Sequence, residues 1–495
     1  MKSLFYRTRV LIIYTITFLI YYKSFAQNKV DAINWNNTVS ISKTTPTLQL
    51  VENPMVRPGS SIHKQTFAAL KDLGADYVRY VPWFPYPKMA VAELKPPTSN
   101  NTYWDFTYLD STIKVFMEAT AGHSVVINFS TTPAWMWKTD SAVAYPENTY
   151  QTCWNYNQGR QLRDTTMKEL SGYFARLLSW YTKGGFNDEL GKFHQSSHFY
   201  KIPYWEVLNE PDLEHNVSPE LYTKMYDAIV GEMKKVSPET KFVGLSLAQT
   251  VNPLYFEYFL NPKNHKPGIL LEGISYHHYS SPSVEAQPLE FYQYTFFEKA
   301  DAFLDRVRYI ENIRKRLAPN TFTMINELGV ILRSPEVAGP IDYSYWNLAG
   351  AMYAHIFLEL TKIGIDAAGE SQLVGYPTQF PDVSMMNWEN GNPNARYWVL
   401  KLLKDNFGPG DKLVNTNLNA GGIDDQGFVT KEGKKILLIN KKNVAVQVQL
   451  PAEAKDAWVS YVDVTTMENP PVKMQLTSNT ISLKPFSVAV INLKN

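Results

Sequence analysis

Residues 201–212 read Lys-Ile-Pro-Tyr-Trp-Glu-Val-Leu-Asn-Glu-Pro-Asp. The apolar and aromatic residues from Tyr204 to Leu208 favour a short buried strand, and Pro211 ends it because proline cannot donate a ladder hydrogen bond. The strand therefore presents Glu210 at its end. A carboxyl group that emerges from a buried strand is partly desolvated, which raises its affinity for a proton. We predict that Glu210 is a general acid/base and that another strand supplies a second carboxylate.

The same unit, a short apolar strand followed by a helix, repeats on both sides of this stretch. Eight alternations fall between about residues 48 and 407, with strands expected at 48–51, 76–81, 123–129, 204–208, 241–247, 273–279, 321–328 and 365–371. Strands that alternate with helices indicate a parallel sheet covered by helices, and eight repeats favour closure into a barrel. The predicted fold class is α/β, with a (β/α)8 TIM barrel over residues 48–407.

The sequence changes character after Gly408-Pro409-Gly410. Residues 411–495 contain short alternating strands without helical periodicity, which predicts a C-terminal antiparallel β-sandwich domain. Residues 27–47 form a polar N-terminal segment in which Val39-Ser40-Ile41 alternates, a pattern compatible with an edge strand of that sandwich.

The N-terminus has the pattern of a signal peptide. Lys2, Arg7 and Arg9 precede an uncharged run over residues 10–22, and small residues at Ser24 and Ala26 fit cleavage after Ala26. The run is shorter than the roughly 20 residues that span a bilayer. We therefore expect residues 1–26 to be removed, the protein to be secreted or periplasmic, and no membrane insertion afterwards.

The composition favours some classes of binding partner and argues against others. Loss of the leader, which holds four basic and no acidic residues, turns the formal net charge from +1 to −3, and a near-neutral surface argues against nucleic acid. Aromatic residues make up 14% of the chain, which suits a protein that packs flat aromatic rings against sugar rings, although large cores also use aromatic residues. Cys153 is the only cysteine, so an intramolecular disulfide is excluded.

Glu327 is the second candidate carboxylate. It lies in Asn326-Glu327 at the end of the seventh expected strand, whereas Glu210 ends the fourth. Barrel enzymes place reacting groups at the C-terminal ends of strands, and paired carboxylates cleave glycosidic bonds. A separation of about 5 to 5.5 Å indicates retention of configuration, and one of roughly 6.5 to 9.5 Å indicates inversion. Glu206 lies deeper along the strand, too far from the barrel mouth to reach substrate.

These motifs resemble a known group of enzymes. Trp205-Glu206-Val207-Leu208-Asn209-Glu210-Pro211-Asp212 resembles the Asn-Glu-Pro acid/base signature of the clan A retaining glycoside hydrolases, and Asn326-Glu327 resembles their nucleophile segment. With the predicted sandwich and the Thr-Pro-Ala-Trp-Met segment at 132–136, the chain is most similar to glycoside hydrolase family 39, the β-xylosidases and α-L-iduronidases. The resemblance implies an exported hydrolase that cleaves O-glycosidic bonds of a plant- or polysaccharide-derived glycan by double displacement, without a cofactor.

The resemblance also implies substrate-binding residues. Asn209 would bind the hydroxyl beside the anomeric carbon, and Tyr276 or His278 would lie next to Glu327. Arg79 points into the barrel and holds Glu327 ionised, or else forms a structural ion pair. Four tryptophans in loops on the same expected side are either sugar platforms or packing residues: Trp83, Trp135, Trp137 and Trp388.

Several alternatives remain open at this stage. Glu370, at the end of the eighth strand, touches substrate or forms an inverting pair, and a carbohydrate-binding protein that has lost turnover would share this scaffold. Glu214 and Glu389 are most simply solvated or paired charges. His277 and His278 suggest a metal pair, but adjacent strand residues point to opposite faces, so we predict no metal site.

Overall fold

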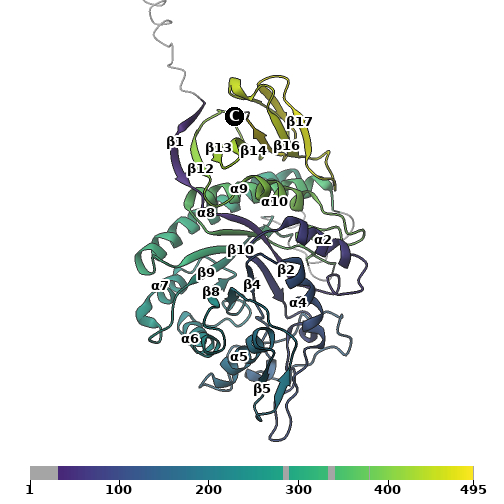
Figure 1. The fold of residues 1–495 in the computed structure, drawn as a ribbon, viewed down its shortest axis with the longest axis vertical. Helices are drawn as coiled ribbons and strands as arrows, with labels where there is room; N and C mark the ends of the chain where they lie inside the picture. The colour runs from purple at the N-terminus through teal and green to yellow at the C-terminus, as the bar shows by residue number, and fades with distance from the viewer. Residues whose placement is uncertain (1–31, 283–288, 333–340, 378–379, 494–495) are drawn as a thin grey trace, which may run out of the picture.

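The computed structural model describes residues 32–282, 289–332, 341–377 and 380–493 (Figure 1). The expected leader, residues 1–26, lies outside the described residues. Within the described ranges, no helix combines the length and the apolar character that a membrane crossing requires.

Eight parallel strands close into a barrel, which confirms the predicted fold class. Each strand pairs with its neighbours in chain order, and the last strand pairs with the first. The barrel strands are β2 (Thr45–Glu52), β3 (Val78–Pro82), β4 (Val125–Ile127), β7 (Tyr204–Glu206), β8 (Lys241–Leu247), β9 (Gly273–Ser280), β10 (Phe322–Val330) and β11 (Ala367–Glu370). Glu210 therefore lies just after the fourth strand of the barrel, and Glu327 lies within the seventh.

Helices surround the barrel and bury one face of each strand. They are α2 (His63–Leu73), α3 (Pro87–Ala90), α4 (Thr107–Ala119), α5 (Lys168–Lys183), α6 (Pro219–Val236), α7 (Pro253–Phe259), α8 (Leu289–Leu317), α9 (Tyr343–Ile363) and α10 (Ala395–Asn406). Local sequence sets their ends: the Ser218 side chain accepts a hydrogen bond from the Leu221 N–H at the start of α6, and Gly364 ends α9 with a left-handed φ of 90°.

A separate antiparallel sheet packs beside α9 and α10 (Figure 1). Its seven strands are, in spatial order, β1 (Ile33–Ile41), β12 (Lys412–Thr416), β13 (Ile423–Thr430), β14 (Gly433–Asn440), β19 (Val488–Asn492), β16 (Trp458–Val462) and β17 (Val472–Gln475). Strands β15 (Val446–Gln449) and β18 (Thr480–Leu483) form a second antiparallel pair. A further hairpin, β5 (Gly185–Asn187) with β6 (Phe193–Gln195), follows α5.

Some boundaries differ from the sequence prediction. The first barrel strand begins at Thr45 rather than Leu48, because its early residues pair with β11. Strands β12 and β13 were not predicted, since their buried residues are mostly consecutive and do not alternate with exposed ones. Residues 33–41 pair with β12, so this segment belongs to the C-terminal sheet although it precedes the barrel in the sequence.

Candidate active site

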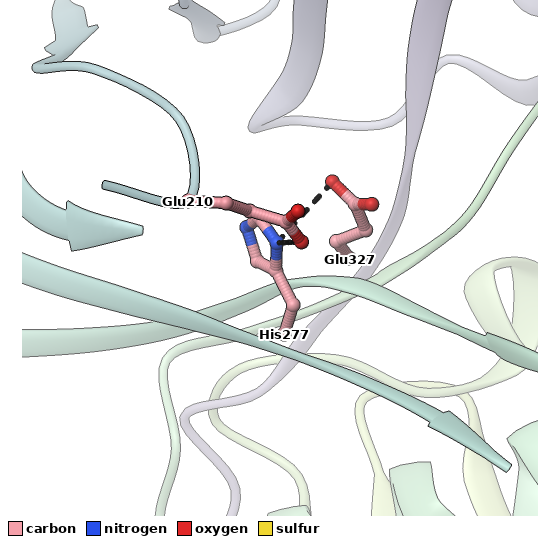
Figure 2. A group of neighbouring side chains, drawn as sticks. All are labelled: Glu210, His277 and Glu327. Carbon is pink, nitrogen blue, oxygen red and sulfur yellow. Dashed lines mark hydrogen bonds and ion pairs between the residues drawn. The ribbon is translucent and has the colours of Figure 1, made fainter. Parts of the chain in front are cut away.

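Glu210, in the turn after β7, and Glu327, in the C-terminal half of β10, face each other, with His277 of β9 beside them (Figure 2). One oxygen of each carboxyl group and one ring nitrogen of His277 all lie within 4.8 Å of one another. The two glutamate side chains are 13% and 14% exposed, and both line the same cleft. The fold thus brings two partly accessible carboxyl groups together from distant parts of the chain.

The turn after β7 sets the direction of the Glu210 side chain. Leu208 and Glu210 both adopt left-handed backbone conformations, with φ of 65° and 42°. Such values are uncommon outside glycine and cluster at functional sites. The Glu210 N–H donates to the Ser246 carbonyl (2.9 Å), which anchors the turn to β8.

Arg79 organises the floor of the site from inside the barrel. Its Nη1 donates to Glu327 Oε2 (2.8 Å), its Nη2 to Asn209 Oδ1 (2.6 Å) and its Nε to Glu206 Oε2 (2.6 Å). The buried Glu206 therefore neutralises the charge of Arg79 from inside the barrel. At the mouth of the barrel, Arg79 holds Glu327 and Asn209 in place. The two readings of Arg79, a contact to Glu327 and a structural ion pair, are both found in the structure.

The pKa values of the two glutamates move in opposite directions. Burial raises the pKa of Glu210 above its ordinary range, and the charge of Glu327 raises it further, against the lowering effect of the His277 hydrogen bond. Burial also acts on Glu327, but the positive charges of His277 and Arg79 outweigh it and hold the pKa of Glu327 below its usual range. The environments therefore move the pKa values of the two carboxyl groups apart, Glu210 toward the protonated form and Glu327 toward the ionised form.

His277 links the two carboxyl groups. Its Nδ1 lies 2.9 Å from Glu210 Oε1 and 3.5 Å from Glu327 Oε2, and its Nε2 lies 3.2 Å from Ser246 Oγ. Burial lowers the pKa of His277, but Glu327 and the hydrogen bond with Glu210 outweigh it and raise the pKa. These three side chains offer three metal-ligand atoms, but a cation here would have to compete with the guanidinium of Arg79 for Glu327.

The cleft around the pair has a volume of about 950 Å³. Trp83, Phe84, Trp154 and Phe380 form an aromatic group on its wall, with ring centroids 5.0 to 6.2 Å apart. The indole N–H of Trp83 donates to Glu214 Oε1 (2.8 Å), which fixes the ring in place. Of the predicted substrate-binding residues, Asn209, Trp83 and His278 line this cleft, and Arg79 contacts it through Glu327.

Three predicted tryptophans lie elsewhere. Trp137 is fully buried, where it stacks on His215 with ring centroids 4.1 Å apart. Trp135 donates its indole N–H to the Glu93 carbonyl and lines a different cavity. Trp388 packs against the hydrophobic core, and its neighbour Asn387 donates a hydrogen bond to Glu468 of the C-terminal domain. The sequence placed all three tryptophans in loops, but it could not show against which part of the protein each loop packs.

The prediction for β9 was offset by one residue. Tyr276 is buried against Phe256 and Phe303 on the helix side, so it does not lie next to Glu327. His278 stacks on Phe303, and burial lowers its pKa to about 3. The β9 residues that contact Glu327 are His277 and Tyr279, and the Tyr279 hydroxyl donates to Glu327 Oε1 (2.6 Å).

Glu370 is not a partner for the catalytic pair. It is fully buried and forms an ion pair with Arg396 of α10 (2.8 Å), and it is absent from the described residues that line the cleft. Burial raises its pKa to about 7, against the opposing charge of Arg396. The inverting arrangement that would use Glu370 is therefore wrong, because the side chain points toward the helix layer.

The sequence analysis missed His277, Tyr279, Trp154 and Glu214. His277 and Tyr279 belong to the predicted strand, and correct assignment of its inward face would have found them. Trp154 lies within residues 138–163, a long insertion after the third barrel strand in which the sequence shows no recognisable motif. Glu214 was taken as a solvated or paired charge, yet it lines the cleft and accepts three hydrogen bonds from side chains.

Comparison with known proteins agrees with this architecture. A GH51 arabinofuranosidase from Xanthomonas axonopodis pv. citri superposes with a TM-score of 0.62 at 13% identity, over 93% of this chain and 98% of that chain. The chain shares its fold with solved glycoside hydrolases. A GH30 endoxylanase from Clostridium papyrosolvens C71 superposes with a TM-score of 0.56 at 13% identity, over 93% and 98% of the two chains.

A third structure, described as a conserved exported protein from Bacteroides fragilis, gives a TM-score of 0.62 at 12% identity, over 93% and 99% of the chains. No protein-family model matches the sequence, and neither does any curated protein. The similarity to families 51 and 30 is therefore a similarity of fold, and the finer assignment to family 39 stays a prediction.

Proposed function

We propose that the protein is a retaining glycoside hydrolase in which Glu210 is the acid/base and Glu327 the nucleophile. The observation that carries this proposal is the pair itself: two carboxyl groups with oxygens within 4.8 Å, one with a raised and one with a lowered pKa. This proximity favours the separation of about 5 to 5.5 Å found in retaining enzymes over the wider gap of inverting enzymes.

The reaction proceeds in two displacements. In the first, the Glu327 carboxylate forms a bond to the anomeric carbon while the glycosidic bond breaks, and Glu210 gives its proton to the departing oxygen. Once Glu327 is esterified, its charge no longer raises the pKa of Glu210, which favours the ionised form of that group. In the second displacement, Glu210 takes a proton from water, the water oxygen attacks the anomeric carbon, and Glu327 leaves as a carboxylate.

Arg79 and Tyr279 support the nucleophile throughout this cycle. Both donate hydrogen bonds to Glu327, at 2.8 and 2.6 Å, so they favour its ionised form and its departure in the second step. In the proposed complex Asn209 binds the hydroxyl next to the anomeric carbon, a contact that strengthens in the transition state.

The proposed substrate is a glycoside from a plant polysaccharide. Two structures of the same fold are an arabinofuranosidase and an endoxylanase, so pentosides are the first class to test. The aromatic group on the cleft wall, Trp83, Phe84, Trp154 and Phe380, provides faces against which sugar rings pack. We also propose that the protein is exported, on the basis of the expected leader and the exported protein of similar fold.

The test replaces each glutamate separately. Glu210→Gln and Glu327→Gln should each lower kcat/KM on aryl β-xylosides or α-L-arabinofuranosides by roughly 10²-fold or more, because general acid/base groups typically contribute 10² to 10⁴. Glu389→Gln is the matched control, since Glu389 is exposed and outside the cleft. Full activity in either cleft variant would refute the assignment.

Two further measurements address the mechanism. External azide should restore turnover to Glu327→Ala and give a glycosyl azide of inverted configuration, since azide replaces the missing nucleophile. Proton NMR of the wild-type reaction should show that the sugar product first appears with the same anomeric configuration as the substrate. Oligosaccharide binding without turnover by the wild type would instead indicate a carbohydrate-binding protein.

A further inference from the structure

Glu214 lies in the loop between β7 and α6, four residues after Glu210. Its Oε1 accepts hydrogen bonds from Asn209 Nδ2 and Trp83 Nε1, both at 2.8 Å. Its Oε2 accepts one from Gln158 Nε2, also at 2.8 Å. One side chain therefore connects the Asn-Glu-Pro turn, the loop after β3 and the long insertion that carries Trp154.

The direction of the Asn209 amide is fixed from its other end. Arg79 can only donate hydrogen bonds, and its Nη2 lies 2.6 Å from the side-chain oxygen of Asn209. The amide nitrogen of Asn209 must therefore face Glu214. A flipped amide would place N–H groups against the guanidinium and an oxygen against the carboxylate.

The same reasoning fixes Gln158. Its Oε1 accepts from the backbone N–H of Thr132 (2.9 Å) and from the hydroxyl of Thr132 (3.2 Å), so its amide nitrogen must also face Glu214. The indole of Trp83 is a donor only. Glu214 thus receives three donors, and none of them can turn into an acceptor.

All three donors are satisfied only by a group that accepts hydrogen bonds and donates none. An ionised carboxylate has two oxygens with about four lone-pair positions, whereas a glutamine amide carries two N–H donors of its own. A glutamine at position 214 would direct an N–H group either at Gln158 or at Asn209 and Trp83. The three hydrogen bonds therefore favour the carboxylate form of Glu214, against burial and the charge of Glu210, which raise its pKa to about 8.

We propose that Glu214 is a positioning residue, which locks the Asn209 amide and the Trp83 ring in the orientation that sugar binding requires. This inference rests on the proposed function. Glu214 does not itself exchange a proton with substrate. It uses one hydrogen of Asn209 Nδ2 and leaves the other for a sugar hydroxyl.

The kinetic test compares Glu214→Gln with the wild type on the best aryl glycoside. An unsatisfied donor in a buried site costs enough to lower kcat/KM by roughly 10- to 100-fold. The variant also removes a carboxyl group whose ionisation is coupled to that of Glu210, since each negative charge opposes the other. The pKa of Glu210 should fall, so the basic limb of the pH profile should move to lower pH, which a purely structural defect would not produce.

Two other variants sharpen the comparison. Trp83→Phe keeps a ring but removes one donor, so its loss of activity should be smaller than that of Glu214→Gln, with an unchanged basic limb. Glu389→Gln removes an exposed carboxylate and should behave as the wild type. If Glu214→Gln retains kcat/KM within twofold and keeps the wild-type basic limb, the inference is wrong.

A second measurement does not depend on turnover. Selective 15N labelling of tryptophan gives one indole signal for each ring, and Trp83→Phe identifies the signal of Trp83 by its loss. In Glu214→Gln that N–H signal should move upfield, because it loses a charged acceptor. An unmoved signal would overturn the inference, whereas an inactive wild type with a shifted signal would refute the proposed function alone.

Discussion

Glu206 lies beneath the catalytic pair and determines where Arg79 can lie. Its carboxylate accepts hydrogen bonds from Arg79 (2.6 Å), Ser275 (2.5 Å), Asn326 (2.6 Å) and Asn128. Burial raises the pKa of Glu206, but the charges of Arg79 and His277 outweigh it, so the pKa is lowered. The sequence analysis correctly placed Glu206 too deep to reach substrate, but its role is to hold the arginine that contacts Glu327.

Glu206→Gln should lower the free energy of unfolding by roughly 3 to 5 kcal/mol, because it removes one of the two carboxylates that pair with the buried Arg79 charge. The lowered pKa means that this stabilisation is present above the unfolded-state pKa, about 4.3, and is lost as the pH falls through the folded-state value. Urea denaturation at pH 7 and pH 3.5 measures both effects. Glu389→Gln should stay within about 0.5 kcal/mol of the wild type, and an equally small loss in Glu206→Gln would contradict the prediction.

At the scale of the element, strand β9 shows why the choice of inward face matters. Ser275, His277 and Tyr279 face the barrel interior, where they contact Glu206, Glu210 and Glu327. Tyr276 and His278 face the helices. Because side chains alternate along a strand, an error of one residue exchanges the two sets completely.

Two tyrosines on opposite faces of β9 provide a matched test. Tyr279→Phe removes a hydrogen bond to a charged group, so kcat/KM should fall by roughly 10- to 150-fold, as expected for a loss of 1.5 to 3 kcal/mol. The pKa of Glu327 should rise, because Tyr279 lowers it, and the acidic limb of the pH profile should move to higher pH. Tyr276→Phe loses a hydroxyl for which the described structure shows no partner and should retain activity. Equal effects of the two substitutions would contradict this assignment of faces.

At the scale of the molecule, the barrel and the C-terminal sheet share one hydrophobic cluster. Leu437 and Ile439 of β14 belong to the cluster that contains the barrel core, whereas Ile436 and Leu438 belong to the separate core of the sheet domain. His355 of α9 adds a polar connection, with Nδ1 2.6 Å from Asp424 of β13 and Nε2 2.8 Å from Asp301 of α8. The sequence analysis had not singled out His355 as a contact between domains.

His355→Gln should lower the free energy of unfolding by roughly 1.5 to 3 kcal/mol at pH 6, since it removes hydrogen bonds to charged groups. Burial lowers the pKa of His355, but the bonds to Asp301 and Asp424 outweigh it and raise the pKa. The stabilisation is therefore fully present below the unfolded-state pKa, about 6.5, and is lost as the pH rises through the folded-state value. Denaturation at pH 6 and pH 9 should show a smaller difference at pH 9. The exposed His123→Gln is the control, and a difference that grows with pH would refute the prediction.

The sequence by itself determined the barrel, because strand and helix patterns alternate eight times along the chain. It also predicted that Glu210 and Glu327 lie near the ends of strands. It could not determine which loop tryptophans reach the cleft, since Trp137 stacks on His215 and Trp388 packs against the hydrophobic core. Only the tertiary structure decided the inward face of β9 and the partners of Glu214. Those depend on interactions between residues far apart in the chain, which local periodicity does not record.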